Sequence, residues 1–305
     1  MLSKTDILRE IGDGISIYPL ILDNIKENSI NLSASRFAWA SKSQKIYYKD
    51  SEYDKNKRFS LCNETGEHEK SIDITMGHTA VVSDDKGNQY IILLPMSTTL
   101  IETEEVLALN NNIGGTYHSK VGLVSKGIGH IGTMVGPNFS GDSLVALHNV
   151  SNNLIVIKVG DTFVSVVFHY LDTPYKHINP TISGHTEKFL ELGIHLSEED
   201  LEELNEDWKK KINEVQNKLK ETPQYKELKE QLKKEKIKTI RNYFNIKNTI
   251  KIIVVVAILV VVYFIAYSID KNASNTIWQD RFFNVGCSGI LVAFISFIFK
   301  GKTRN

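Results

Sequence analysis

The chain has 305 residues, and its 36 basic side chains balance its 36 acidic ones. This even charge argues against nucleic acid as a partner, because domains that bind nucleic acid carry an excess of Lys and Arg. The two cysteines, Cys62 and Cys287, argue against a disulfide framework, and no Cys or His spacing fits a metal site. We predict no metal and no cofactor. The length allows one sizeable domain with additional segments.

Residues 1–180 are predicted to be mostly β. Short apolar runs such as Gln89–Leu94, Asn153–Val159 and Thr162–Tyr170 are separated by Gly, Asn and Asp turns, a pattern typical of strands. Closely spaced strands with few helices indicate a β-barrel or a jelly-roll-like sandwich. The chain opens without the apolar core of a signal peptide, so this domain is expected to remain in the cytoplasm.

The segment Gly136–Asn149 combines turn residues with an alternating apolar pattern. Its Gly, Pro and Asn lead into that pattern, which favours a β-hairpin followed by a half-buried strand. Asp142 is the one carboxylate in the segment. The segment therefore has the form of an active-site hairpin without its acids.

Residues 181–249 are predicted to form a charged helical connector. Ser197–Asp200 resembles a capping box, and apolar residues follow it at helical spacing. Thr222 suits an N-cap and Pro223 the first position of a further helix. Two interpretations stay open: a helical arm that packs on its own domain, and a stalk that associates with other copies.

Two apolar runs, residues 250–269 and 282–299, are predicted transmembrane helices, because about 20 apolar residues span a bilayer core. Lys233–Lys251 holds seven basic residues and one acid, and the tail holds three more basic residues. The positive-inside rule then places the N-terminal domain and the C-terminus in the cytoplasm, on the inner membrane. Gly289 and Ala293 either pack the two helices of one hairpin together or build an oligomer. The two helices themselves form either a membrane anchor or a pore.

Several motifs together resemble the superfamily of deoxycytidine triphosphate deaminases and deoxyuridine triphosphatases. Met1–Ile7 is similar to the opening helix of that family, and Asn28–Leu32 to its Ser-Ile-Asp-Leu strand. Gly114–Gly122 falls where the family has its Gly-Arg-Ser-Ser phosphate loop. Gly136–Asn149 falls on the Asp-Pro-Gly-Trp hairpin and catalytic strand, and Val159–Phe168 on the Pro-Gly-x-x-Ile-Gly-Gln strand. Residues 45–90 match no part of the family pattern. The resemblance implies a dUTPase-like barrel and a trimeric or higher homo-oligomer.

The chemistry departs from the family at four positions. The resemblance places Gly136 at the sugar-recognising Asp, Ala146 at the Glu that acts as general acid and base, Gly115 at a phosphate-binding Arg, and Ser165 at the Gln. Neither glycine nor alanine accepts a proton, so water attack on a pyrimidine or a phosphate lacks its base. We therefore predict no catalytic residues and no enzymatic activity.

A binding role remains possible for the residues that replace the phosphate loop. Hydroxyls, an aromatic ring and one cation suit phosphate contact and base stacking. Alternatively, these are ordinary loop residues. The candidate ligand-binding residues are Thr116, Tyr117, His118, Ser119, Lys120, Asn138 and Ser165.

Two functions follow from this architecture. The first is a catalytically inactive membrane effector of bacterial antiphage defence, in which a nucleotide or cyclic nucleotide second messenger controls oligomerisation and disruption of the lipid bilayer, causing abortive infection. Its architecture resembles membrane effectors of cyclic-nucleotide defence, in particular the β-barrel and two-span effector of the Panoptes system. The second is a membrane-tethered deaminase or triphosphatase of deoxynucleotides. Gly136 and Ala146 favour the effector.

Overall fold

The computed structural model describes residues 1–48, 59–61, 70–129, 132–176, 181–182, 189 and 191–243, together with 260, 261, 264, 267 and 268. The chain divides into two compact units, Met1–Leu232 and Lys233–Asn305. Apart from the five single positions, the predicted transmembrane helices at 250–269 and 282–299 lie outside the described residues. Within the described part, no helix combines the length and apolar character needed to span a bilayer.

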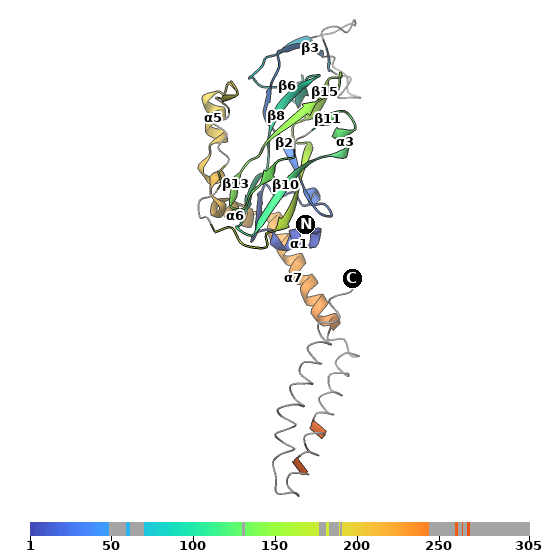
Figure 1. Cartoon of the computed structure of the whole chain (residues 1–305), viewed down its shortest axis with the longest axis vertical. Coiled ribbons are helices and arrows are strands. Elements are labelled where there is room, and N and C mark those ends of the chain that lie inside the picture. Colours follow the sequence, from blue (N-terminus) through green and yellow to red (C-terminus); the bar gives the residue numbers. More distant parts are fainter. Residues whose placement is uncertain are drawn as a thin grey trace. The chain divides into compact units, whose positions relative to one another are not determined.

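The first unit is mainly β, as the sequence predicts (Figure 1). Its strands are β1 (Ile15–Tyr18), β2 (Ile30–Ala40), β3 (Gln44–Tyr48), β4 (Phe59–Leu61), β5 (Lys70–Ile74), β6 (Val81–Ser83), β7 (Gln89–Leu93), β8 (Ser97–Thr103), β9 (Val106–Leu109), β10 (Ile113–Ser119), β11 (Ile128–Gly129), β12 (Met134–Val135), β13 (Phe139–Gly141), β14 (Leu144–Asn149), β15 (Ile155–Lys158), β16 (Thr162–Tyr170) and β17 (Thr181–Ile182). Its helical elements are α1 (Lys4–Glu10), η1 (Leu22–Asn24), α3 (Val121–Val124), α5 (Glu198–Leu204), η2 (Asp207–Lys210) and α6 (Ile212–Glu221), and α7 (Pro223–Tyr243) begins in it.

The strands form one seven-stranded sheet in the order β11-β14-β8-β2-β16-β10-β12 and one four-stranded sheet in the order β1-β9-β13-β17. Two three-stranded sheets, β15-β7-β6 and β4-β3-β5, contain the strands that lie in or overlap residues 45–90, for which the family resemblance had no counterpart. Alternation places every second side chain of a strand in the core. In β16, Val166 and Phe168 are fully buried, whereas Ser165 and Val167 lie on the other face and are half-buried.

The predicted hairpin at Gly136–Asn149 is wrong in its pairing. β13 pairs with β9 and β17, whereas β14 pairs with β8 and β11, so the chain crosses from one sheet to another between them. We call residues 136–149 the corner segment. A hairpin and a corner both need turn residues, and the sequence pattern does not specify which strand becomes the neighbour.

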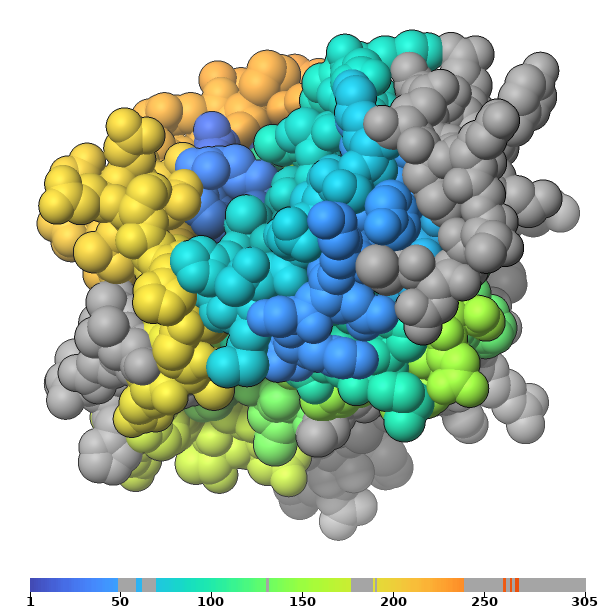
Figure 2. Space-filling view, turned by 90° about the horizontal axis from the view of Figure 1, so that it is seen from above, coloured from blue at the N-terminus to red at the C-terminus, as the bar shows by residue number. Residues whose placement is uncertain are grey.

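The connector packs on its own domain from α5 to the start of α7. Ser197 caps α5 through the Asp200 N–H, at 3.1 Å, and α7 begins at Pro223 as predicted. α6 lies on β1, β9 and β13, where Val215 is fully buried. In Figure 2 the yellow atoms of the connector lie directly against the blue and teal atoms of the strands. For this stretch the first of the two interpretations, an arm packed on its own domain, is confirmed.

Candidate functional site

Ala146 lies on a face of the large sheet that the connector covers. It pairs with Leu100 of β8, which in turn pairs with Trp39 of β2, and directly paired residues of antiparallel strands share a face. The ring of Phe189 packs on Trp39 with centroids 4.6 Å apart. Ile194 and Leu204 of the connector belong to the same apolar cluster. Ala146 is half-buried, and its direct partner Leu100 packs against this apolar cluster.

A buried charged cluster lies where the corner segment meets the connector. Lys209 of η2 reaches in with a side chain that is 11% exposed, and its Nζ lies 3.3 Å from Oδ2 of Asp142, whose side chain is 6% exposed. The same Nζ donates to the carbonyl of Glu203 at 2.7 Å. Ser140 donates its hydroxyl to the carbonyl of Lys209 at 2.7 Å. The contacts of Lys209 with Ser140 and Asp142 therefore hold the connector on the corner segment at two points.

Glu102 of β8 belongs to this cluster and is completely buried. Burial first, and the neighbouring charge of Asp142 second, raise the pKa of Glu102 well above its ordinary value, while Lys209 opposes the shift. Nζ of Lys209 also lies 3.8 Å from Oε2 of Glu206, so this one cation faces the carboxylates of both Asp142 and Glu206. Within the described residues, no group of three or more His, Cys, Asp or Glu side chains is placed to hold a metal ion.

The residues predicted to replace the phosphate loop lie mostly in a strand. Thr116, Tyr117, His118 and Ser119 belong to β10, which pairs with β16 on one side and β12 on the other. Tyr117 is 4% exposed and turns into the core, where its hydroxyl bonds Ser143. Burial raises the pKa of Tyr117 to about 12. The ring of this tyrosine is therefore not exposed for base stacking.

The other face of β10 brings two predicted residues together. His118 pairs with Ser165, and Ser165 pairs with Asn31 in β2, so the three lie in one row. Ser165 donates its hydroxyl to Oδ1 of Asn31 at 2.7 Å. Lys120, just beyond β10, donates to the carbonyl and hydroxyl of Thr162, and burial lowers its pKa. Thr116 shares the outward face with His118, and Asn138 lies elsewhere, in the corner segment.

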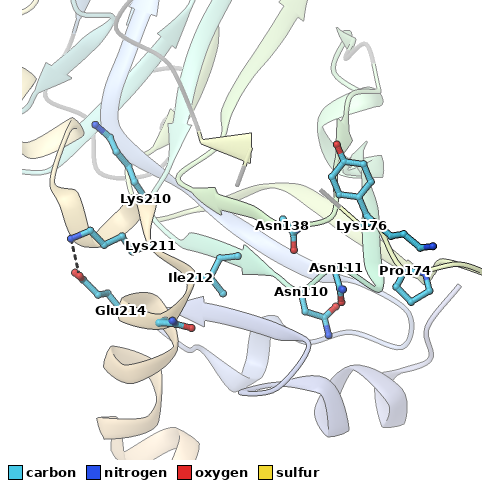
Figure 3. A pocket seen from close by; sticks show the side chains of 11 residues that line it. Asn110, Asn111, Asn138, Pro174, Lys176, Lys210, Lys211, Ile212 and Glu214 are labelled. Atoms are coloured by element: carbon cyan, nitrogen blue, oxygen red, sulfur yellow. Dashed lines mark hydrogen bonds and ion pairs between the residues drawn. The ribbon is translucent and has the colours of Figure 1, made fainter. Parts of the chain in front are cut away.

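A pocket of about 840 Å³ opens beside the corner segment (Figure 3). It is lined by Asn110 and Asn111 of the β9–β10 turn, by Asn138, and by the stretches Pro174–Lys176 and Lys210–Glu214. Asn138 has a left-handed backbone, φ 59°, and its N–H donates to the carbonyl of Asn110 at 3.1 Å. The pocket thus joins the corner segment to the connector at the residues that follow Lys209.

Sequence reasoning singled out Asn138 but missed Glu102 and Lys209. Glu102 stands in an otherwise apolar and hydroxylic strand, where a charged residue is unusual and was the available signal. Lys209 carried no such signal, because it is one of several lysines in a charged segment and its partner Asp142 lies 67 positions away.

Comparison of the sequence with known proteins identifies its family. The profile of the dCTP deaminase-like family matches residues 1–171. Over 106 residues the chain is 29% identical to a dCTP deaminase of Pyrococcus horikoshii, covering 33% of this chain and 68% of that protein. A dCTP deaminase of Thermococcus kodakarensis is 28% identical over 109 residues, covering 34% and 70%.

Among solved structures, the 2′-deoxycytidine 5′-triphosphate deaminase of Agrobacterium tumefaciens matches 55% of this chain and 45% of its own, with 16% identity and a TM-score of 0.34. The dUTPase of EIAV matches 32% of this chain and 89% of its own, with 15% identity and a TM-score of 0.26. The fold and the family profile define a dCTP deaminase/dUTPase-like β domain. The chain belongs to the dCTP deaminase-like family.

Proposed function

We propose that this chain is a catalytically inactive, nucleotide-sensing membrane effector of bacterial antiphage defence. Binding of a nucleotide or cyclic nucleotide to its β domain controls, through the connector, whether the apolar C-terminal segments assemble in the inner membrane and disrupt it. The observation that carries the proposal is the docking of the connector on the corner segment through Lys209 and Ser140.

Two features of the face that bears Ala146 support the loss of chemistry. Deamination needs a base that can reach both the substrate and a water molecule, and alanine supplies none. The residues in the same row as Ala146 are apolar, namely Leu100 beside it and Trp39 in the next strand.

The docking contacts supply a physical route from binding to output. A ligand changes a conformational equilibrium by the difference between its affinities for the two states. The corner segment and the connector meet in one buried ion pair, so a ligand that favours one position of the corner also favours one position of the connector. Homo-oligomers of the family type would multiply this effect by bringing several C-terminal segments together.

Turnover and membrane output are tested separately. The full chain is incubated with dCTP and dUTP, and ammonia and pyrophosphate are measured. We expect no release above a blank, and release at an enzyme-like rate would instead support a membrane-tethered deaminase or triphosphatase. Dye entry is then compared between cells that express the full chain and cells that express residues 1–249. Equal dye entry in both would refute the membrane output.

A further inference from the structure

The pocket beside the corner segment uses residues that the family profile does not include. The profile ends at residue 171, whereas Pro174–Lys176 and Lys210–Glu214 form two of the pocket walls. The remaining wall is made by three asparagines of the β domain, Asn110, Asn111 and Asn138. The pocket therefore exists only because the connector is docked on the domain.

The chemistry of the walls differs from side to side. Figure 3 shows the three asparagine side chains on one side, together with Lys176, while the ammonium groups of Lys210 and Lys211 lie on the other side and point outward, away from the asparagines. Amide groups donate and accept hydrogen bonds at once, as the edge of a nucleobase or a sugar requires. Lysine ammonium groups are point charges that suit phosphates.

The lysines are available to a new anion. Lys211 pairs with Glu214 at 2.9 Å, and both side chains of this pair are largely exposed to solvent. Exposed ion pairs contribute little free energy, so a phosphate can replace the glutamate as the partner. Lys210 donates to Oδ1 of Asn205 at 3.2 Å. This amide oxygen carries no net charge, so an anion can replace it as the partner of Lys210.

We propose that this pocket is a binding site for a phosphate-bearing nucleotide, with base or sugar on the asparagine side and phosphates at the lysine edge. The size agrees, because pockets for small ligands have volumes of roughly 300 to 1,000 Å³. This proposal rests on the proposed function for its ligand class, and it names the site and the residues.

The geometry also gives a direction to the coupling. A ligand that contacts both Asn138 and Lys210 needs the connector in its docked position. A ligand that binds one state alone stabilises that state, and at a concentration 100 times its Kd it lowers the population of the other about 100-fold. Nucleotide in this pocket therefore holds the connector on the domain, and its release frees the connector.

The test measures affinity and docking on the full chain. Isothermal titration uses dCTP, cyclic di-AMP and inorganic triphosphate, with wild type, K210A/K211A, N138G and the control K220A/K226A. The control removes the same two charges from exposed positions on α6 and α7 outside the pocket. Glycine suits the left-handed backbone of Asn138, so N138G removes the amide without backbone strain.

We expect dCTP or cyclic di-AMP to bind the wild type and to lose at least about tenfold in affinity in K210A/K211A, which removes charge-assisted hydrogen bonds. In N138G, which removes neutral hydrogen bonds, we expect a loss of about fivefold. The control should change affinity less than about twofold. Unchanged binding in both pocket variants, or equal weakening by the control, overturns the site. Triphosphate that binds as tightly as the nucleotides overturns the nucleotide class.

Hydrogen exchange of α6 amides in the same samples separates the two proposals. Nucleotide should slow exchange in α6 of the wild type, and not in K210A/K211A. Pocket-dependent binding without slower exchange would keep the site and refute the coupling. Slower exchange that persists in both pocket variants would keep the coupling and refute the site.

Discussion

Replacing Lys209 with methionine tests whether the buried ion pair holds the connector. The substitution keeps the length of the side chain and removes its charge, and it leaves Asp142 buried without its cation at 3.3 Å. Removal of one partner of a buried ion pair costs about 3 to 5 kcal/mol. Since the side chain of Lys209 keeps 11% exposure, we take the lower limit, about 3 kcal/mol, which corresponds to an increase of about 100-fold in the undocked population.

The assay is native-state hydrogen exchange of the full chain, read at the amides of α6. K220M is the matched control, because it makes the same substitution at Lys220, an exposed lysine of α6. D142N completes the double-mutant cycle, and K209M/D142N should recover part of the loss, because it removes the charge that K209M strands. Equal exchange in K209M and K220M would refute the argument that Lys209 secures the connector.

Three further predictions follow from the same contacts. Because the pKa of Glu102 is raised, the folded state holds a proton that the unfolded state releases above about pH 4.5, so the free energy of unfolding falls as the pH rises past that value; E102Q should flatten this dependence in urea titrations at pH 5 and 8. Phe189→Ala, at a position 2% exposed, should cost about 3 kcal/mol and speed exchange in α5. Gly12→Ala should lower the melting temperature more than Gly87→Ala. Both glycines have a left-handed backbone, but a Cβ at Gly12 would overlap the ring of Tyr225, whereas a Cβ at Gly87 meets no atom within 4 Å.

Local patterns predicted the elements well. The short apolar run Thr162–Tyr170 is confirmed as strand β16 with the predicted bounds, and Pro223 opens α7. Both depend on interactions within a few residues: strand alternation in one case and the fixed φ of proline in the other. The corner segment failed for the opposite reason. Its turn residues are local, but the partners of β13 and β14 are set by sheets whose other strands lie far away in the sequence.

The candidate site was predictable only in part. Motif comparison pointed to the corner segment and to Asn138, which lines the pocket. The aromatic ring of Tyr117 is suited to base stacking, but the register of β10 turns this ring into the core. Lys209 and Glu102 are notable only because both side chains are buried close to one another, and this burial depends on how the connector packs on the domain. No single sequence position carries that information.

The two uses of the face that bears Ala146 exclude one another. Leu100 and Glu102 of β8 share this face with Ala146, because side chains alternate along a strand and paired residues point the same way. Deamination would require a substrate and water on the face, whereas docking requires Phe189 and its neighbours in the same cluster to occupy it. A connector that packs on this face excludes a substrate from it. On the proposed function, the change from enzyme to regulator therefore needs no new fold. It needs the connector in place of the substrate on one face of the sheet. It also needs a nucleotide pocket beside the connector, through which the position of the connector is controlled.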